Sequence, residues 1–136
     1  MARRSRPLVL DSWAAIAYLE DEPAGRIIAD LIADAHEAGM PILMSVVNAG
    51  EVWYTVARGT SEADAEETIN ELGQLGVQFV DADWSITHEA AKFKAKNKMS
   101  YADCFAAALA RQNKAALVTG DPEFKKVEGS LSITWV

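Results

Sequence analysis

This chain has a single cysteine, few histidines, no long apolar run and fewer basic than acidic residues. The lone Cys104 rules out a disulfide within the chain, which suits a reducing compartment. No apolar stretch approaches the roughly 18 residues that a membrane-spanning helix needs. The apolar segment behind the basic N-terminus is too short to form the core of a signal peptide. We therefore expect a cytoplasmic protein without membrane association.

The shortage of positive charge excludes another class of function. The chain carries 13 Lys and Arg against 20 Asp and Glu, for a net charge of −7. Proteins that hold nucleic acid by bulk charge are normally basic, so such a scaffold is excluded. A nuclease is not excluded, because bound metal ions reverse the local field at a site. The two histidines, His36 and His88, lie outside the motifs described below, which argues against a metal-free ribonuclease mechanism based on histidines.

Half of the 136 residues are hydrophobic, which is enough for a sizeable core in one domain. The apolar period alternates between that of a strand and that of a helix. The pattern predicts strands at residues 8–10, 41–44, 77–80, 116–119 and 132–136, and helices at 12–19, 24–37, 46–57, 62–75, 84–96 and 101–112. Strands separated by helices favour parallel pairing with right-handed crossovers, so we expect one α/β domain.

Four acidic residues stand where such a sheet would bring them together. Asp11 and Asp121 each follow an apolar run, whereas Glu51 and Asp103 lie near the starts of two helical segments. The carboxyl ends of parallel strands share one edge, where ligands bind in open α/β sheets. Carboxylates gathered in one hollow repel each other unless a cation joins them. A hard divalent ion such as Mg2+ or Mn2+ suits this set of oxygen ligands.

Each acid also has a simpler interpretation. Asp11 and Asp121 precede predicted helical turns and can serve as N-caps. Asp103 follows Ser100 at the spacing of a capping box, and a lone Glu51 on a helix is usually solvated. Independent capping gives no reason for all four to converge on one edge, so we retain both interpretations.

Polar neighbours of these acids are candidate auxiliary residues. Ser12 and Thr119 can orient a ligand or its water, and Asn48, one turn before Glu51, can face the same hollow. Lys92 and Lys96 share one helix face and are candidate phosphate contacts, with a solvated helix end as the alternative. Further basic candidates are Arg3, Arg4, Arg6, Lys125 and Lys126.

Four stretches together resemble the PIN-domain nucleases, and in particular the VapC toxins of bacterial toxin–antitoxin pairs. They are VLDS at residues 9–12, NAGEV at 48–52, SYADCFAAA at 100–108 and VTGDPEF at 118–124. The resemblance implies that residues 1–136 form one PIN domain. It also implies a three-layer α/β/α fold around a mainly parallel sheet of roughly five strands.

The resemblance further implies a function and a set of partners. A Mg2+ or Mn2+ ion would be bound by Asp11, Glu51, Asp103 and Asp121, with Glu123 at a position that is often acidic in the family. The activity implied is a single-strand-specific endoribonuclease that inhibits translation by cutting tRNA or ribosomal RNA. The implied partners are a cognate VapB-like antitoxin and a second copy of the chain.

Other functions remain open at this stage. A catalytically silent PIN-like module would bind RNA or protein without cutting, although such proteins usually lose part of the acidic set. A DNA flap nuclease would need a helical arch, for which this chain has no room. A phosphatase of doubly wound fold would want a second Asp two residues after its nucleophile, and Trp13 occupies that position.

Overall fold

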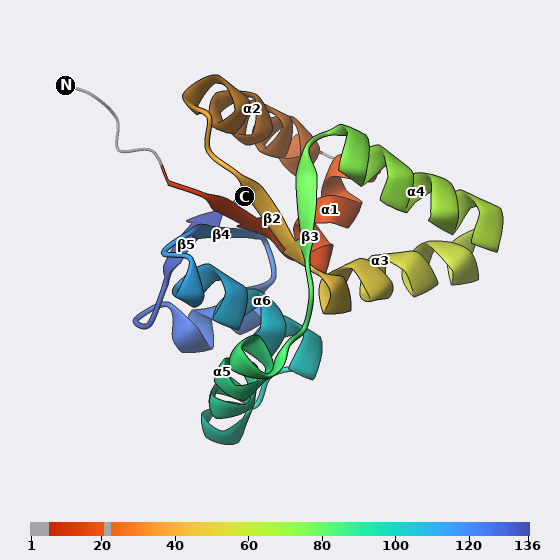
Figure 1. Ribbon diagram of the computed structural model, residues 1–136. Coiled ribbons are helices and arrows are strands. Elements are labelled where there is room, and N and C mark those ends of the chain that lie inside the picture. The colour runs from red at the N-terminus through yellow and green to blue at the C-terminus, as the bar shows by residue number, and fades with distance from the viewer. Residues whose placement is uncertain (1–5, 21–22) are drawn as a thin grey trace.

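Five parallel strands form the sheet of this protein in the computed structural model, which describes residues 6–20 and 23–136. They are β1 (Leu8–Leu10), β2 (Ile42–Ser45), β3 (Val77–Val80), β4 (Ala116–Thr119) and β5 (Ser132–Trp135). The order β3-β2-β1-β4-β5 places β1 at the centre, where Leu8 pairs with Ile42 on one side and Ala116 on the other (Figure 1). The predicted parallel sheet is confirmed. Arg3 and Arg4, two of the basic candidates named above, lie outside the described residues.

The helices begin and end where local signals place them. They are α1 (Ser12–Leu19), α2 (Pro23–Ala38), α3 (Val46–Gly59), α4 (Glu62–Gln74), α5 (Trp84–Lys96), α6 (Tyr101–Gln112) and the 3-10 helix η1 (Pro122–Val127). Ser45, Ser61 and Ser100 cap α3, α4 and α6 through their hydroxyl groups. Gly39 follows α2 with φ of 69°, a left-handed conformation that costs glycine little. The predicted helices are confirmed, although α3 runs past its predicted end to Gly59.

Alternating strand residues divide the core between the two faces of the sheet. Val9 and Leu117 pack with apolar side chains of α5, α6 and η1. Leu10 and Val118 pack with side chains of α1, α2, α3 and α4 on the opposite face. This period of two is what a sheet covered on both sides requires, and it confirms the predicted three-layer α/β/α arrangement.

Helix α6 is the most deeply buried helix segment of the molecule. All of its residues from Asp103 to Ala110 are buried, including Cys104, and α5 and α3 both pack against it. Helices α3 and α4 pair as a hairpin that projects away from the sheet (Figure 1). Within residues 6–20 and 23–136, no helix is both long and apolar enough to cross a lipid bilayer.

Candidate functional site

An open hollow of about 350 Å3 lies at the carboxyl edge of the sheet, and we call it the acidic hollow. Its four lining carboxyl groups come from α3, from α6, from the second residue after β4 and from η1. The lining residues are Ser12, Trp13, Ile16, Glu51, Tyr54, Thr55, Ser100, Asp103, Asp121 and Glu123. The predicted convergence of Glu51, Asp103 and Asp121 on one edge is therefore present in the structure.

Asp11 lies beneath this hollow and is almost completely buried. Its Oδ1 accepts a hydrogen bond from the Ala14 amide at 2.8 Å, which caps α1, and its Oδ2 accepts from the Thr119 hydroxyl at 2.5 Å. The same Thr119 oxygen accepts from the Asp121 amide at 3.0 Å. Asp11 thus caps a helix and also approaches the other acids, so the two interpretations of this residue are compatible.

The electrostatics of Asp11 reflect its burial and its acidic neighbours. Burial raises the pKa of Asp11 from 3.8 to about 7, because the charged form loses its hydration. The hydrogen bonds from Thr119 and Ala14 oppose this rise in pKa, while the negative charges of Asp121 and Glu51 add to it. The carboxyl group is therefore held in a place where a proton or a cation stabilises it.

Asp103 meets similar conditions on the other side of the hollow. Its amide donates to the Ser100 hydroxyl at 3.2 Å, which is half of the predicted capping box. The pKa of Asp103 is raised to about 7, mainly by burial and in addition by the charge of Asp121 and a hydrogen bond with Glu123. Glu123 also accepts from the Ser100 amide at 2.7 Å, so this residue ties η1 to the start of α6.

Glu51 lies on the wall of the hollow rather than on a solvated helix face. It is partly buried, and its Oε1 accepts a hydrogen bond from the Ser12 hydroxyl, which joins α3 to α1. Contrary to our expectation, Asn48 does not line the hollow. It is fully buried, and its Nδ2 donates to the Ala102 carbonyl at 3.1 Å, while its Oδ1 has no partner among the described residues. Asn48 therefore braces α3 against α6 next to Asp103.

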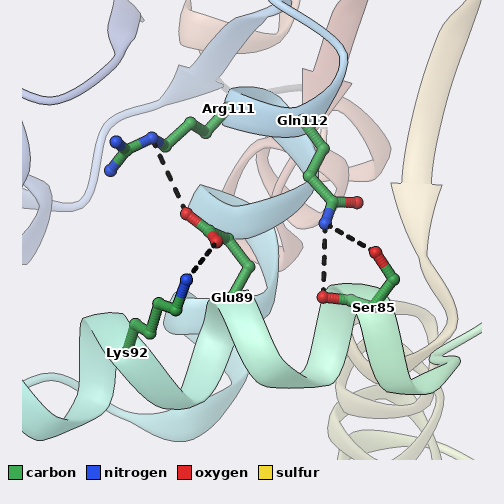
Figure 2. Close-up of polar contacts among 5 residues, drawn as sticks. All are labelled: Ser85, Glu89, Lys92, Arg111 and Gln112. Carbon is green, nitrogen blue, oxygen red and sulfur yellow. Dashed lines mark hydrogen bonds and ion pairs between the residues drawn. The ribbon is translucent and has the colours of Figure 1, made fainter.

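The two candidate phosphate contacts on α5 also lie outside the residues that line the hollow. The Lys92 ammonium is 3.7 Å from Glu89, which in turn lies 3.6 Å from the Arg111 guanidinium (Figure 2). Gln112 donates to the backbone and side chain of Ser85, so the whole network fastens α5 to α6 (Figure 2). Lys96 is exposed at the C-terminal end of α5.

Two other lysines have a structural role that the sequence did not reveal. The Lys94 ammonium donates to the Met99 carbonyl, and the Lys126 ammonium donates to the Lys98 carbonyl. Together with Glu123, these side chains hold residues 97–100, the segment that leads into α6 and Asp103. Four lysines between residues 92 and 98 were a signal in the sequence, but a lysine bound to a backbone carbonyl leaves no distinct pattern.

Trp13 is a further residue of the hollow that the sequence pattern did not identify. A Cβ at Gly120 would lie 2.3–2.6 Å from three adjacent carbons of the Trp13 six-membered ring. Only glycine therefore leaves room for this indole between β4 and Asp121. No sequence pattern indicates this contact, because the two residues are far apart along the chain.

The donor atoms at the hollow suit a hard divalent cation. Carboxylate oxygens from Asp and Glu are the ligands that Mg2+ and Mn2+ prefer. Among residues 6–20 and 23–136, no three acidic, histidine or cysteine side chains already surround a single point. The carboxylates are instead engaged by Ser12, Thr119 and backbone amides, and each of their oxygens keeps a free lone pair. The residue types therefore fit the cation.

Comparison with known families and structures gives consistent results. The family model described as PIN domain matches residues 8–130. The VapBC2 complex of Rickettsia felis, solved with a DNA fragment of its promoter, is 15% identical, with a TM-score of 0.77 over 94% of this chain and 97% of that chain. The DNA-bound VapBC of Salmonella typhimurium is 14% identical, with a TM-score of 0.74 over 96% and 98%.

A third solved structure extends the likeness. VapC20 of Mycobacterium tuberculosis, described as a toxin that cleaves the sarcin–ricin loop, is 15% identical, with a TM-score of 0.67 over 88% of this chain and 94% of that chain. At these identities the likeness to solved structures concerns the fold. Comparison with curated proteins gives no significant match.

Proposed function

Because this chain belongs to the PIN domain family, we propose that it is a divalent-metal-dependent endoribonuclease that acts as a VapC-like toxin. In this proposal residues 1–136 form one PIN domain. The observation that carries the proposal is the meeting of carboxylates from four separate segments at one open hollow, with Asp11 buried beneath it. A cluster of carboxylates that binds a divalent cation can serve phosphodiester hydrolysis, because the cation neutralises the charge of the phosphate.

We assign the carboxylates as ligands of Mg2+ or Mn2+. Asp11 and Asp103 would hold the ion directly, and Glu51 and Asp121 would hold it through water or hold a second ion. When bound, the cation supplies an activated water nucleophile and balances the charge of the phosphate. The raised pKa of about 7 at Asp11 and Asp103 supports this assignment, because these two carboxyls are the ones that a cation would relieve most.

The remaining residues of the set would orient the carboxylates. Thr119 holds Asp11, and Ser12 holds Glu51, through hydrogen bonds from their hydroxyl groups. Glu123 would act as a further acidic group at the rim while it fixes Ser100. Asn48 would support the site from behind by fixing α3 to α6. Outer groups of this kind keep ligands in position and affect both metal affinity and rate.

We infer that the substrate is single-stranded RNA, in tRNA or ribosomal RNA, and that cutting it inhibits translation. The open shape of the hollow favours a strand that can be splayed out, as the bases of RNA loops are. Cleavage of the sarcin–ricin loop, described for the structural relative VapC20, supports this substrate class. Lys92 and Lys96 would contact phosphates farther along the strand.

We further propose a VapB-like antitoxin and a second copy of this chain as partners. Several structural relatives were solved as VapBC complexes, which supports an antitoxin partner. Ile27 on α2 is a large apolar side chain that is 51% exposed, and a partner that covered it would remove this apolar surface from water.

RNA cleavage by the purified chain, freed of any partner, tests the proposal. Total RNA would be incubated with Mg2+ or Mn2+ and, separately, with EDTA. Asp11→Asn and Asp103→Asn should abolish metal-dependent cutting. Asp83 caps α5 and does not line the hollow, and Asn can cap a helix as well, so Asp83→Asn is the control that should leave cutting unchanged. Expression of the wild type alone should arrest growth, and expression of either inactive variant should not.

Two other results would contradict the proposal. A folded protein that cuts no RNA with any metal and does not arrest growth would favour a catalytically silent PIN-like module. Cutting that survives both Asp→Asn changes would place the chemistry elsewhere in the chain.

A further inference from the structure

Trp13 presents an aromatic surface beside the acidic groups of the hollow. The near-equal distances of 2.3, 2.5 and 2.6 Å from a Gly120 Cβ position to three ring carbons mean that the glycine lies over the ring face, not its edge. One face of the six-membered ring is therefore fixed against the backbone between Thr119 and Asp121. The rest of the partly buried indole lines the acidic hollow.

A second, smaller hollow lies along α1 and shares part of its lining with the first. It has a volume of about 210 Å3 and is lined by Trp13, Ile16, Ala17 and Glu20. Trp13 and Ile16 belong to both hollows, so the indole stands at their junction. Trp13 therefore borders the hollow in which the scissile phosphate would lie and also the smaller hollow next to it.

The chemistry of this junction selects a flat, neutral group. A second phosphate is disfavoured there, because the acidic walls repel anions that no cation accompanies. The other aromatic residue of the hollow, Tyr54, already has the Arg58 guanidinium over its ring at 5.0 Å from the centroid. Trp13 is thus the aromatic residue whose ring surface is available at the junction. Nucleobases of any identity stack on aromatic rings of this kind.

We propose that Trp13 is a base-stacking residue that holds the nucleobase next to the scissile phosphate. This inference deepens the proposed function and rests on it for the identity of the substrate as RNA. Stacking would pull one nucleotide out of the strand and set its phosphate over Asp103 and Asp121. It would also explain why Gly120 carries no side chain, since any Cβ there would push the indole out of place.

A double-mutant cycle between protein and RNA tests the stacking. The ligands are a short mixed-sequence RNA and a fully abasic strand with the same phosphates, and binding is measured in Ca2+ to avoid turnover. Removing the bases should weaken binding to the wild type about 5- to 150-fold more than to Trp13→Leu, which is the range measured for stacking one base on an aromatic side chain. Trp13→Phe keeps an aromatic face and should retain part of this coupling.

Trp84→Leu serves as the matched control, because Trp84 is 72% exposed on α5 and stacks on His88 instead of lining the hollow. This variant should show the wild-type penalty for base removal. An equal penalty in wild type, Trp13→Leu and Trp13→Phe would overturn the stacking role and leave the junction to a protein partner. If Trp13→Leu does not fold, the Trp13→Phe variant decides alone: a smaller penalty for base removal than in the wild type supports the stacking role, and an equal penalty overturns it.

Cleavage in Mg2+, run in parallel, separates this inference from the proposed function. Base-dependent binding through Trp13 without cutting would leave the stacking role standing and remove the nuclease. Cutting without any coupling between Trp13 and the bases would do the reverse.

Discussion

Thr119 and Asp11, 108 residues apart in sequence, are joined by a buried hydrogen bond of 2.5 Å between hydroxyl and carboxylate. The same hydroxyl oxygen accepts from the Asp121 amide, so one side chain positions the acids that follow β1 and β4. Thr119→Val keeps the shape of the side chain but leaves both partners unpaired. We expect it to lower the free energy of unfolding by about 1–3 kcal/mol and the cleavage rate about 10- to 100-fold.

Urea unfolding and single-turnover cleavage would measure these two effects. Thr119→Ser, which keeps the hydroxyl, should stay close to wild type in both. A Val variant that unfolds and cuts like wild type would show that the hydroxyl does not position the acids.

The raised pKa of about 7 at Asp11 and Asp103 predicts an unusual pH dependence of stability. The folded state holds protons that the unfolded chain, with pKa near 3.8, releases. These two groups therefore favour folding below about pH 4, and their contribution is lost as pH rises through about 7. The thermal midpoint of the protein in EDTA should fall from about pH 5 to about pH 8, and Mg2+ should raise it most at the upper end.

Asp103→Asn is the matched variant for this pH experiment. It removes one of the two titrating groups, so its midpoint in EDTA should fall less steeply with pH. Equal slopes in wild type and variant would contradict a raised pKa at Asp103.

Gly120→Ala should force the Trp13 ring out of its place, because the new methyl would lie 2.3 Å from its nearest ring carbon. Overpacking of this kind typically destabilises a protein by about 1–3 kcal/mol. In a Trp13→Leu background the obstruction is absent, so the same change should cost much less. Chemical denaturation of the four proteins in this cycle would measure the coupling, and additive effects would refute the contact.

Replacing both Lys92 and Lys96 with Ala should weaken RNA binding and flatten its salt dependence if they contact phosphates. Lys92 is 3.7 Å from Glu89, which offsets part of its charge, so Lys96→Ala should have the larger effect of the two single changes. Binding measured across a salt series would separate them. If the salt dependence of RNA binding is the same in the double variant as in the wild type, Lys92 and Lys96 on α5 do not contact the RNA.

Much of the fold is readable from the sequence because its signals are local. Ser61 and Ser100 cap helices with their own hydroxyls, and Gly39 ends α2, so the boundaries follow from residues a few positions apart. The meeting of Asp11 and Asp121 at one edge also follows from a general rule, that parallel strands end together.

The finer geometry depends on contacts that no local pattern encodes. The hydrogen bond from Ser12 to Glu51 and the packing of Trp13 on Gly120 each join segments that are distant in sequence. The Lys94 ammonium binds the Met99 carbonyl, a contact with a backbone group that no residue type in the sequence indicates. Asn48 was expected to face the hollow but does not line it, because its side chain is buried between α3 and α6 and binds the Ala102 carbonyl.

The central place of β1 has a consequence for synthesis of the chain. β1 and its neighbour β2 are made before β4, which covers the other edge of β1 and lies more than one hundred residues after β1 in the sequence. Until then Asp11 has neither Thr119 nor Asp121 beside it, and the apolar edge of β1 is open to wrong pairing. A chain that is interrupted before β4 therefore carries Asp11, Glu51 and Asp103 but lacks Thr119, Asp121 and Glu123, so the acidic hollow can assemble only after β4 and η1 have been made.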